Sequence, residues 1–220
     1  DRIATMLFCP TSTAVVNLNN EGIENNVYNV GDVMYDVTLH YLGYAKKVVD
    51  LSRWSVEEGN YSLCTLHRAE NTDTPENLTG VVAALQEISL VAPVVFPVHP
   101  RTKKCLEKAG LLSSLKGVNI CEPVSYFEML RLESSARVIL TDSGGVQKEA
   151  FFNKVPCITL RNETEWVETV TSGANTLCGT DAHSIVEAWN NPEDFQFGES
   201  PYGDGYASQK IVEKIFESIA

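Results

Sequence analysis

The stretch ARVILTDSGGVQKEAFF, residues 136–152, decides the fold because its pattern changes in the middle. The first part is an apolar run that ends at Asp142 and indicates a strand. Small residues then turn the chain, and a helical pattern starts near Val146. A strand that leads through a glycine turn into a helix is part of a βαβ unit, from which parallel sheets are built.

The same alternation of strand and helix patterns continues on both sides of this stretch. Helical spacing separates several of the strand-like runs, as in PENLTGVVAALQEISLV, residues 75–91. Alternating elements with short turns predict an α/β protein with a Rossmann-like, doubly wound parallel sheet. An all-β protease barrel does not fit this pattern. The strand-like runs are TMLFC (5–9), NVYNV (26–30), YSLCTL (61–66), VVFPV (94–98), GVNIC (117–121), RVILT (137–141) and PCITL (156–160).

The letters DSGG at 142–145 leave three roles open for Ser143. The unpaired N–H groups at a helix N-terminus accept phosphate, Gly144 and Gly145 allow close backbone approach, and the Ser143 hydroxyl adds a donor. Glu149, about a turn later, would reach a ribose hydroxyl beside that phosphate. A plain N-cap turn is the alternative. A nucleophile is disfavoured, because an esterase elbow needs a glycine where Thr141 stands.

Three further strand-like runs end in basic residues. His67 and Arg68 follow residues 61–66, His99 and Arg101 follow residues 94–98, and Arg161 follows residues 156–160. A structural histidine, a solvated helix start and a salt-bridged loop are the respective alternatives. Such residues at the carboxyl ends of parallel strands face the ligand crevice. In a chain with a formal charge of -12, their gathering predicts a negatively charged ligand such as a diphosphate.

Composition excludes several classes of protein. The charge of -12 argues against nucleic-acid binding, and no apolar stretch approaches the length of a membrane span. The six cysteines show neither a CxxC pair nor zinc-ligand spacing, which indicates buried free thiols in a reducing cytoplasm. No metal or nicotinamide motif occurs, so the sequence predicts no cofactor.

The chain resembles the non-hydrolysing UDP-N-acetylglucosamine 2-epimerase family over essentially all of its length. The resemblance implies two Rossmann-like domains of the GT-B type, with this chain as the C-terminal part of something longer. Residues 1–37 would end the N-terminal domain, 38–58 form a linking helix, 59–200 form the nucleotide-binding domain, and 201–220 form a closing helix. The matching stretches are FCPT, NLNNEGI, VGDVMYD, TLHRAENTD, PVHPRT, TDSGGVQKEA, LRNETEWVETV and SPYGDGYAS.

The resemblance implies an isomerase of polysaccharide biosynthesis that inverts C2 of a UDP-linked N-acetylated amino sugar, UDP-GlcNAc to UDP-ManNAc. UDP is eliminated and added back. The family's carboxylates for the C2 proton would precede Asp1, so the 220-residue chain alone is expected to be inactive. A cytoplasmic homodimer is implied for the full-length protein.

The resemblance also assigns residues to the substrate. His67 would be catalytic beside Arg68, and Glu149 would bind the ribose. The diphosphate would lie on Ser143, Gly144 and Gly145, the uracil against Val124 to Met129, and the sugar nucleotide near His99, with Arg161 close to the ligand.

Two features of the sequence keep other substrates and functions open. Trp166 stands where some bacterial members have arginine, and GDVMYD and QKEAFFNKVPCITLR resemble a branch that acts on UDP-2,3-diacetamido-2,3-dideoxy-glucuronic acid. A GT-B glycosyltransferase or a UDP-binding module is the alternative from another class.

Overall fold

A computed structural model describes residues 1–219. The chain forms two compact units by its internal contacts. Unit one consists of Asp1–Gly43 together with the chain from Glu199 onward, and unit two consists of Tyr44–Gly198. Each unit is described separately below.

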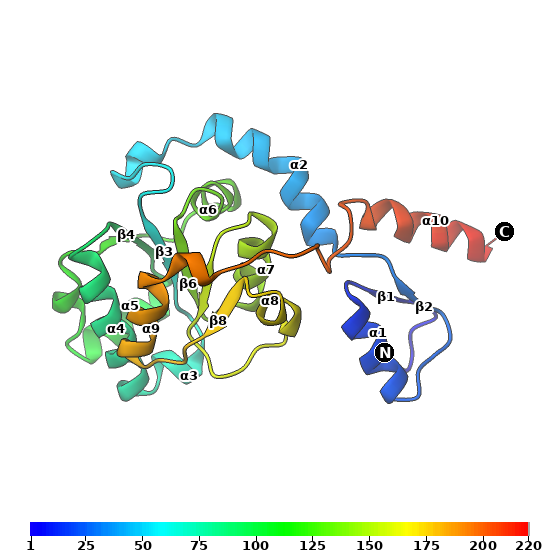
Figure 1. Ribbon diagram of the computed structural model, residues 1–220, viewed down its shortest axis with the longest axis horizontal. Helices are drawn as coiled ribbons and strands as arrows, with labels where there is room; N and C mark the ends of the chain where they lie inside the picture. The colour runs from blue at the N-terminus through cyan, green and yellow to red at the C-terminus, as the bar shows by residue number, and fades with distance from the viewer. Residues whose placement is uncertain (220) are drawn as a thin grey trace. The chain divides into compact units, whose positions relative to one another are not determined.

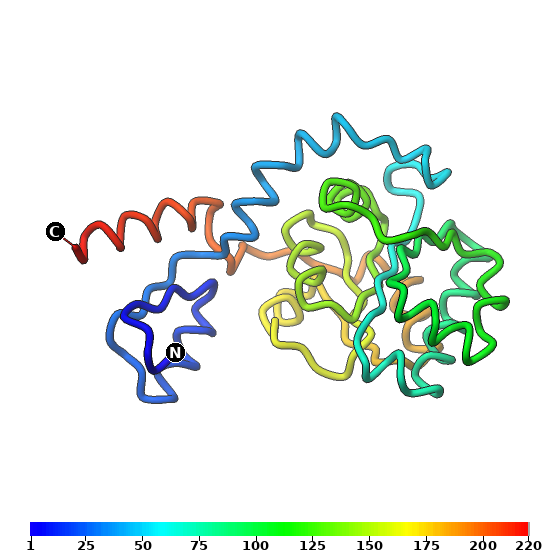
Figure 2. The backbone as a smooth tube through the Cα atoms, turned by 180° about the vertical axis from the view of Figure 1, so that it is seen from behind, coloured from blue at the N-terminus to red at the C-terminus, as the bar shows by residue number. Residues whose placement is uncertain are grey.

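Unit two is built on a parallel sheet in the strand order β5-β4-β3-β6-β7-β8. Ser62 on β3 pairs with Val94 on β4 and with Val138 on β6. Strands β4 and β5 lie on one side of β3, and β6, β7 and β8 lie on the other, while the chain runs between them through the helices drawn in Figures 1 and 2. The crevice where the strand order reverses is the usual ligand site of such sheets. The strands are β3 (Ser62–Thr65), β4 (Val94–Pro97), β5 (Asn119–Cys121), β6 (Val138–Thr141), β7 (Cys157–Thr159) and β8 (Asn175–Leu177).

Helices cover both faces of this sheet, which confirms the predicted doubly wound α/β fold (Figure 1). Leu63 and Ile139 point to one face, and Cys64 and Leu140 point to the other. Because both faces are buried, the central strands read as unbroken apolar runs. One face holds η1 (Leu51–Trp54), α6 (Tyr126–Glu133) and α7 (Gly144–Phe152), and the other holds α4 (Pro75–Ser89), α5 (Pro100–Lys108), η2 (Leu112–Leu115) and α9 (Ala182–Asn190).

Some elements differ from the sequence-based expectation. Helix α7 begins at Gly144, two residues before the expected start, so both glycines lie in its first turn. The edge strand β8 was not expected, because three residues between a glycine-containing turn and a loop carry too little periodic signal. Three short helices complete the unit: α3 (Ala69–Thr72), α8 (Val167–Thr171) and η3 (Pro192–Asp194).

Unit one joins the beginning and the end of the chain. The backbone N–H of Asp32 donates to the carbonyl of Tyr202 at 2.9 Å, and Gly31 lies so close that a Cβ there would meet the same carbonyl at 2.8 Å. The stretches VGDVMYD and SPYGDGYAS, far apart in sequence, therefore interlock. The elements are β1 (Leu7–Cys9), which pairs in parallel with β2 (Val27–Asn29), α1 (Ser12–Asn20), the first part of α2 (Val33–Val48) and α10 (Ala207–Ile219).

Asp36 caps the N-terminus of α10 from α2. Its carboxylate accepts from the backbone N–H of Ala207 at 3.0 Å and from the backbone N–H and hydroxyl of Ser208, both at 2.7 Å. Burial opposes ionisation, but these hydrogen bonds outweigh it and hold the pKa of Asp36 below its ordinary value. An ionised cap also suits the positive end of the helix.

Replacing Asp36 with alanine should loosen the start of α10. Loss of an N-cap costs about 0.5–2 kcal/mol, so we expect faster amide hydrogen exchange at Ser208 and its neighbours. Glu24→Ala, an exposed acidic residue of the same unit, is the matched control. Equal exchange rates in both variants would contradict the capping role.

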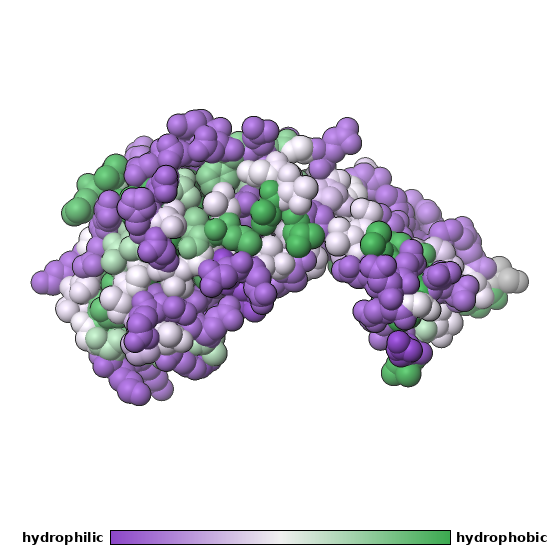
Figure 3. All heavy atoms as spheres, turned by 60° about the horizontal axis from the view of Figure 1, so that its bottom comes forward, coloured by the Kyte–Doolittle hydropathy of each residue, from purple (hydrophilic) through white to green (hydrophobic). Residues whose placement is uncertain are grey.

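Polar residues cover most of the surface that Figure 3 presents, with hydrophobic patches between them. The exposed apolar side chains of unit one include Val37 and Leu39 on α2 and Phe216 on α10. Within residues 1–219, none of the helices combines the length and the apolar character needed to cross a bilayer.

Candidate active site

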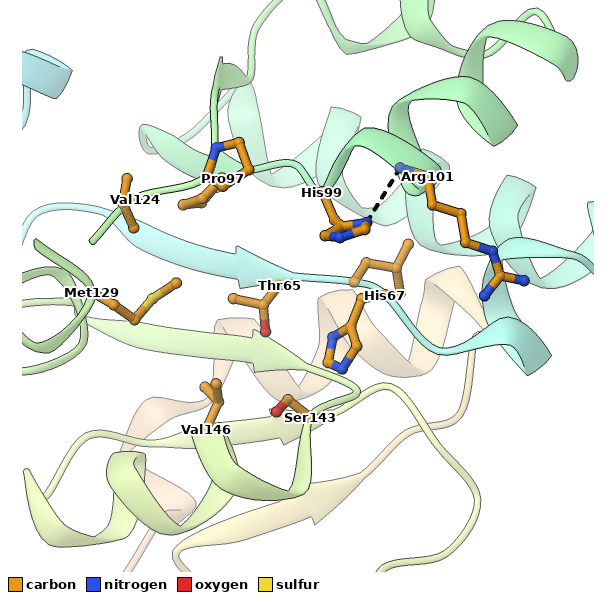
Figure 4. Close-up of a pocket in the computed structure, with 11 residues that line it drawn as sticks. Thr65, His67, Pro97, His99, Arg101, Val124, Met129, Ser143 and Val146 are labelled. Atoms are coloured by element: carbon orange, nitrogen blue, oxygen red, sulfur yellow. Dashed lines mark hydrogen bonds between the residues drawn. The ribbon is translucent and has the colours of Figure 1, made fainter. Parts of the chain in front are cut away.

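A pocket of about 350 Å³ opens at the carboxyl ends of β3, β4 and β6, beside the reversal of strand order. His67, Ser143 and His99 lie at one end of it, and Val124 and Met129 lie at the other (Figure 4). The polar end suits an anion and the apolar end suits a flat ring. The lining residues are Thr65, Leu66, His67, Pro97, His99, Arg101, Pro123, Val124, Met129, Ser143 and Val146.

The side chain of Asp142 accepts hydrogen bonds from several residues at the polar end of the pocket. Its fully buried carboxylate accepts from the backbone N–H of Arg68 at 2.9 Å and from the backbone N–H of His67 at 3.1 Å. The Asn71 amide donates to it at 3.2 Å, and the Nδ1 atom of His67 lies 3.3 Å away. The sequence interpretation gave Asp142 no role. Its place directly after a buried strand, beside Ser143, was the signal that would have found it.

His67 and Asp142 shift each other toward their charged forms. The hydrogen bond to Asp142 raises the pKa of His67 and outweighs the effect of burial. Burial acts to raise the pKa of Asp142, but the hydrogen bonds from His67 and Arg68 outweigh it and lower that pKa. Because Nδ1 faces Asp142, the Nε2 atom of His67 is the one left for a ligand. The side chain of His67 is 51% exposed.

The N-terminus of α7 adjoins this pair. Ser143 is the N-cap residue, but its side chain makes no capping hydrogen bond. The first N–H groups of α7, together with this hydroxyl, offer donors to an anion. A Cβ on Gly144 would collide with the Glu165 carboxylate and the Trp166 indole, so the loop after β7 packs directly on the helix start.

Two arginines form ion pairs with Glu165 beside the N-terminus of α7. Arg68 contacts it at 3.2 Å and Arg161 at 2.8 Å, while Arg161 also pairs with Glu70 at 3.3 Å. Arg161 is buried in this network and does not line the pocket, although the sequence placed it among the ligand contacts. Arg68 is 34% exposed and lies beside His67.

The remaining expected site residues fall close to the pocket. His99 and Arg101 line it, with the Arg101 N–H donating to the Nδ1 atom of His99 at 3.2 Å, and Arg101 pairs with Asp73 at 2.6 Å (Figure 4). Glu149 lies on α7 three residues after Val146, which lines the pocket. Residues three apart share a helix face, so Glu149 lies on the same face of α7 as Val146, one turn further along the helix. Among residues 1–219, no group of three or more His, Cys, Asp or Glu residues is arranged to hold a metal ion.

The family model described as UDP-N-acetylglucosamine 2-epimerase matches residues 1–216. The chain belongs to this epimerase family. A UDP-N-acetylglucosamine 2-epimerase homolog of Methanococcus maripaludis is 48% identical over 222 residues, covering 98% of this chain and 61% of the relative. The UDP-2,3-diacetamido-2,3-dideoxy-D-glucuronate 2-epimerase of Pseudomonas aeruginosa is 46% identical, covering 98% of this chain and 60% of the relative.

A solved structure supports the same placement in the epimerase family. The UDP-GlcNAc 2-epimerase of Methanocaldococcus jannaschii, in complex with UDP-GlcNAc and UDP, is 42% identical with a TM-score of 0.89, covering 99% of this chain and 62% of that one. This chain therefore spans about three fifths of the length of these relatives. Its parallel sheet is one Rossmann-like sheet of a GT-B-type epimerase fold.

Proposed function

We propose that the full-length protein inverts C2 of a UDP-linked N-acetylated amino sugar, interconverting UDP-GlcNAc and UDP-ManNAc. The observation that carries this proposal is that His67, paired with the buried Asp142, and Ser143 at the N-terminus of α7 line one pocket. An epimerisation through departure of UDP needs a site that stabilises a leaving diphosphate, and this end of the pocket supplies one. The similarity to epimerases over the whole chain supports the assignment.

The proposed reaction has two steps. The bond between C1 of the sugar and the β-phosphate oxygen breaks while C2 loses its proton, which leaves a 2-acetamidoglucal with a C1–C2 double bond. UDP then adds back to C1, and a proton returns to the opposite face of C2.

The residues of unit two act on the leaving group. Negative charge grows on the β-phosphate as C1–O breaks, and the first N–H groups of α7 and the Ser143 hydroxyl donate to it. A protonated His67 adds positive charge from Nε2, and Asp142 favours this form because it raises the pKa of His67. Arg68 reaches the same phosphate if its guanidinium leaves Glu165. In this mechanism carboxylates exchange the C2 proton, and the residues of unit two supply the half of the site that holds the leaving UDP.

A second substrate has a specific observation in its favour. The relative that acts on UDP-2,3-diacetamido-2,3-dideoxy-D-glucuronate is 46% identical to this chain, close to the figure for the Methanococcus maripaludis homolog. That sugar carries a carboxylate, and Arg101 at the polar end of the pocket is a cation that could meet it. The reaction at C2 is the same for both sugars.

The test is the stereochemistry at C2. The full-length protein is incubated in D₂O with UDP-GlcNAc and, in parallel, with UDP-2,3-diacetamido-2,3-dideoxy-glucuronate. We expect a manno epimer carrying deuterium at C2 from one of the two. Transfer of the sugar to an acceptor would indicate a glycosyltransferase, and binding of UDP without C2 exchange would indicate a binding module.

Replacing Ser143 with alanine should weaken UDP binding, because Ser143 acts as a hydrogen-bond donor and not as a nucleophile. Loss of a hydrogen bond to a charged group costs about 1–3 kcal/mol, or about 5- to 150-fold in Kd. Calorimetry with UDP measures this change, and Ser113→Ala at an exposed position of η2 is the control. An unchanged Kd, or a covalent adduct at Ser143 in mass spectrometry, would contradict the donor role.

We also propose that the full-length protein is a cytoplasmic homodimer, as the family resemblance implies. Light scattering during size-exclusion chromatography measures the mass in solution. A mass of one chain at micromolar concentration would contradict the dimer.

A further inference from the structure

Glu133 is a charged residue type in a place where a charge is costly. It is the last residue of α6, and its side chain is completely buried against the sheet. No N–H or hydroxyl donor among the described residues reaches either of its carboxyl oxygens. A buried carboxylate without donors is strongly unfavourable. The group is therefore expected to keep its proton.

The partner of Glu133 is a second carboxyl, that of Glu149 on α7. Two carboxyls can form a hydrogen bond only when one of them holds a proton, because two carboxylates repel each other. Burial, with the neighbouring charge of Glu149 as the second cause, raises the pKa of Glu133 well above its ordinary value. Burial therefore favours Glu133 as the carboxylic acid of the pair, with the Glu149 carboxylate as the acceptor that its O–H would meet.

Titratable side chains other than Glu149 also lie near Glu133. Tyr61 and Cys157 are the titratable groups that face it from the sheet, and burial raises the pKa of both, that of Cys157 to about 12. Both are neutral at physiological pH. Arg131 lies on the same helix as Glu133. Its guanidinium donates to the Ser135 hydroxyl at 2.5 Å and to the Glu58 carboxylate at 3.2 Å.

The helical spacing puts Glu149 on the same face of α7 as Val146. It is half-buried and lies one turn after Val146, which lines the pocket, on the helix whose first turn forms the anion cradle. A nucleotide held by its diphosphate at that helix start presents its ribose within reach of the next turn. A carboxylate there accepts hydrogen bonds from the two ribose hydroxyls only if its plane is fixed.

We propose that Glu133 is a positioning residue, which donates a hydrogen bond to Glu149 and so orients the Glu149 carboxylate to accept from the ribose hydroxyls of a bound nucleoside diphosphate. The proposal rests on the proposed function, because it needs a nucleotide in this pocket. It adds a residue that never touches the ligand and yet sets the preference for a ribose over a sugar without hydroxyls.

The test compares two ligands on the full-length protein. Calorimetry measures the Kd of UDP and of 2′,3′-dideoxy-UDP for the unchanged protein, Glu133→Leu and Glu133→Gln. We expect Glu133→Leu to weaken UDP binding about 5- to 20-fold, the loss of about one hydrogen bond, and to leave binding of the dideoxy ligand unchanged. Glu133→Gln should keep the preference for UDP, because its amide N–H replaces the acid O–H.

The control and the contrary outcomes are distinct. Ile139→Val, in the same core cluster, should lower stability and leave the ratio of the two Kd values unchanged. Equal weakening of both ligands by Glu133→Leu would show a merely structural role and overturn the proposal. If the unchanged protein binds UDP and 2′,3′-dideoxy-UDP with the same Kd, the positioning role of Glu133 is overturned and the epimerase proposal stands. If UDP does not bind at all, both proposals are overturned.

A second measurement applies even if Glu133→Leu does not fold. The pKa of Glu133 is raised on folding, so its contribution to stability is fully present below the unfolded pKa of about 4.3 and is lost as pH rises above it. Glutamine has no such dependence. Glu133→Gln should therefore unfold at higher urea than the unchanged protein at pH 7–8, and this gain should disappear near pH 4. A gain that does not depend on pH would overturn the assignment of the proton to Glu133.

Discussion

Replacing His67 with glutamine in the full-length protein is expected to slow epimerisation of UDP-GlcNAc by about 10²- to 10⁴-fold, the usual contribution of a positioned acid or base. Glutamine keeps a donor near the diphosphate but carries no charge, so the leaving UDP loses its stabilisation while the C–O bond breaks. Because the His67 side chain is 51% exposed, the fold should remain. Steady-state kinetics and urea unfolding measure the two effects.

The pH dependence of the epimerisation rate also tests the role of His67. The pKa of His67 lies above its ordinary value, so the imidazolium persists to higher pH than in a free histidine. The rate of the unchanged enzyme should fall as pH rises through that raised pKa, and the variant should lack this limb. His183→Gln, at a side chain that is 87% exposed, is the control. A His67→Gln variant that retained both the rate and the limb would remove His67 from the mechanism.

Replacing Asp142 with asparagine is expected to destabilise the protein by about 3 kcal/mol or more. The carboxylate accepts backbone N–H groups from His67 and Arg68, and hydrogen bonds to a charged group contribute about 1.5–3 kcal/mol each. An amide cannot serve every one of these donors, because one of its two heavy atoms is itself a donor. Urea unfolding at pH 7 measures the loss.

The difference between Asp142→Asn and the unchanged protein should depend on pH. The folded pKa of Asp142 is lowered, so its stabilisation is present above the unfolded pKa of about 3.9 and is lost as pH falls through the folded pKa. The two proteins should therefore converge in acid. The pH limb assigned to His67 should also move to lower pH in the variant.

Asp73→Asn is the control for Asp142→Asn. This side chain is 53% exposed and pairs with Arg101, an exposed ion pair worth at most about 1 kcal/mol. If Asp142→Asn costs no more than this control, then the hydrogen bonds to Asp142 do not hold the polar end of the pocket.

The sequence by itself was enough for the fold class. Residues 136–152 change from a buried strand to a helix across two glycines, and this local pattern repeats along the chain. Local periodicity and turn chemistry act over a few neighbouring residues, so they are legible in one sequence. The predicted anion site has the same origin, since a helix N-terminus after a strand is a local feature.

Only the tertiary structure decided which residues complete the site. Asp142 and His67 are 75 positions apart and meet because β3 and β6 are neighbours in the sheet. Asp36 and Ser208 are 172 positions apart, and no local pattern pairs them. The ion pairs of Arg161 with Glu70 and Glu165 also needed the tertiary structure, because they form where the loop after β7 folds back onto α7. The proposed pairing of Glu133 with Glu149 likewise depends on the packing of α6 beside α7, which buries Glu133 completely, and burial is a property of the whole fold.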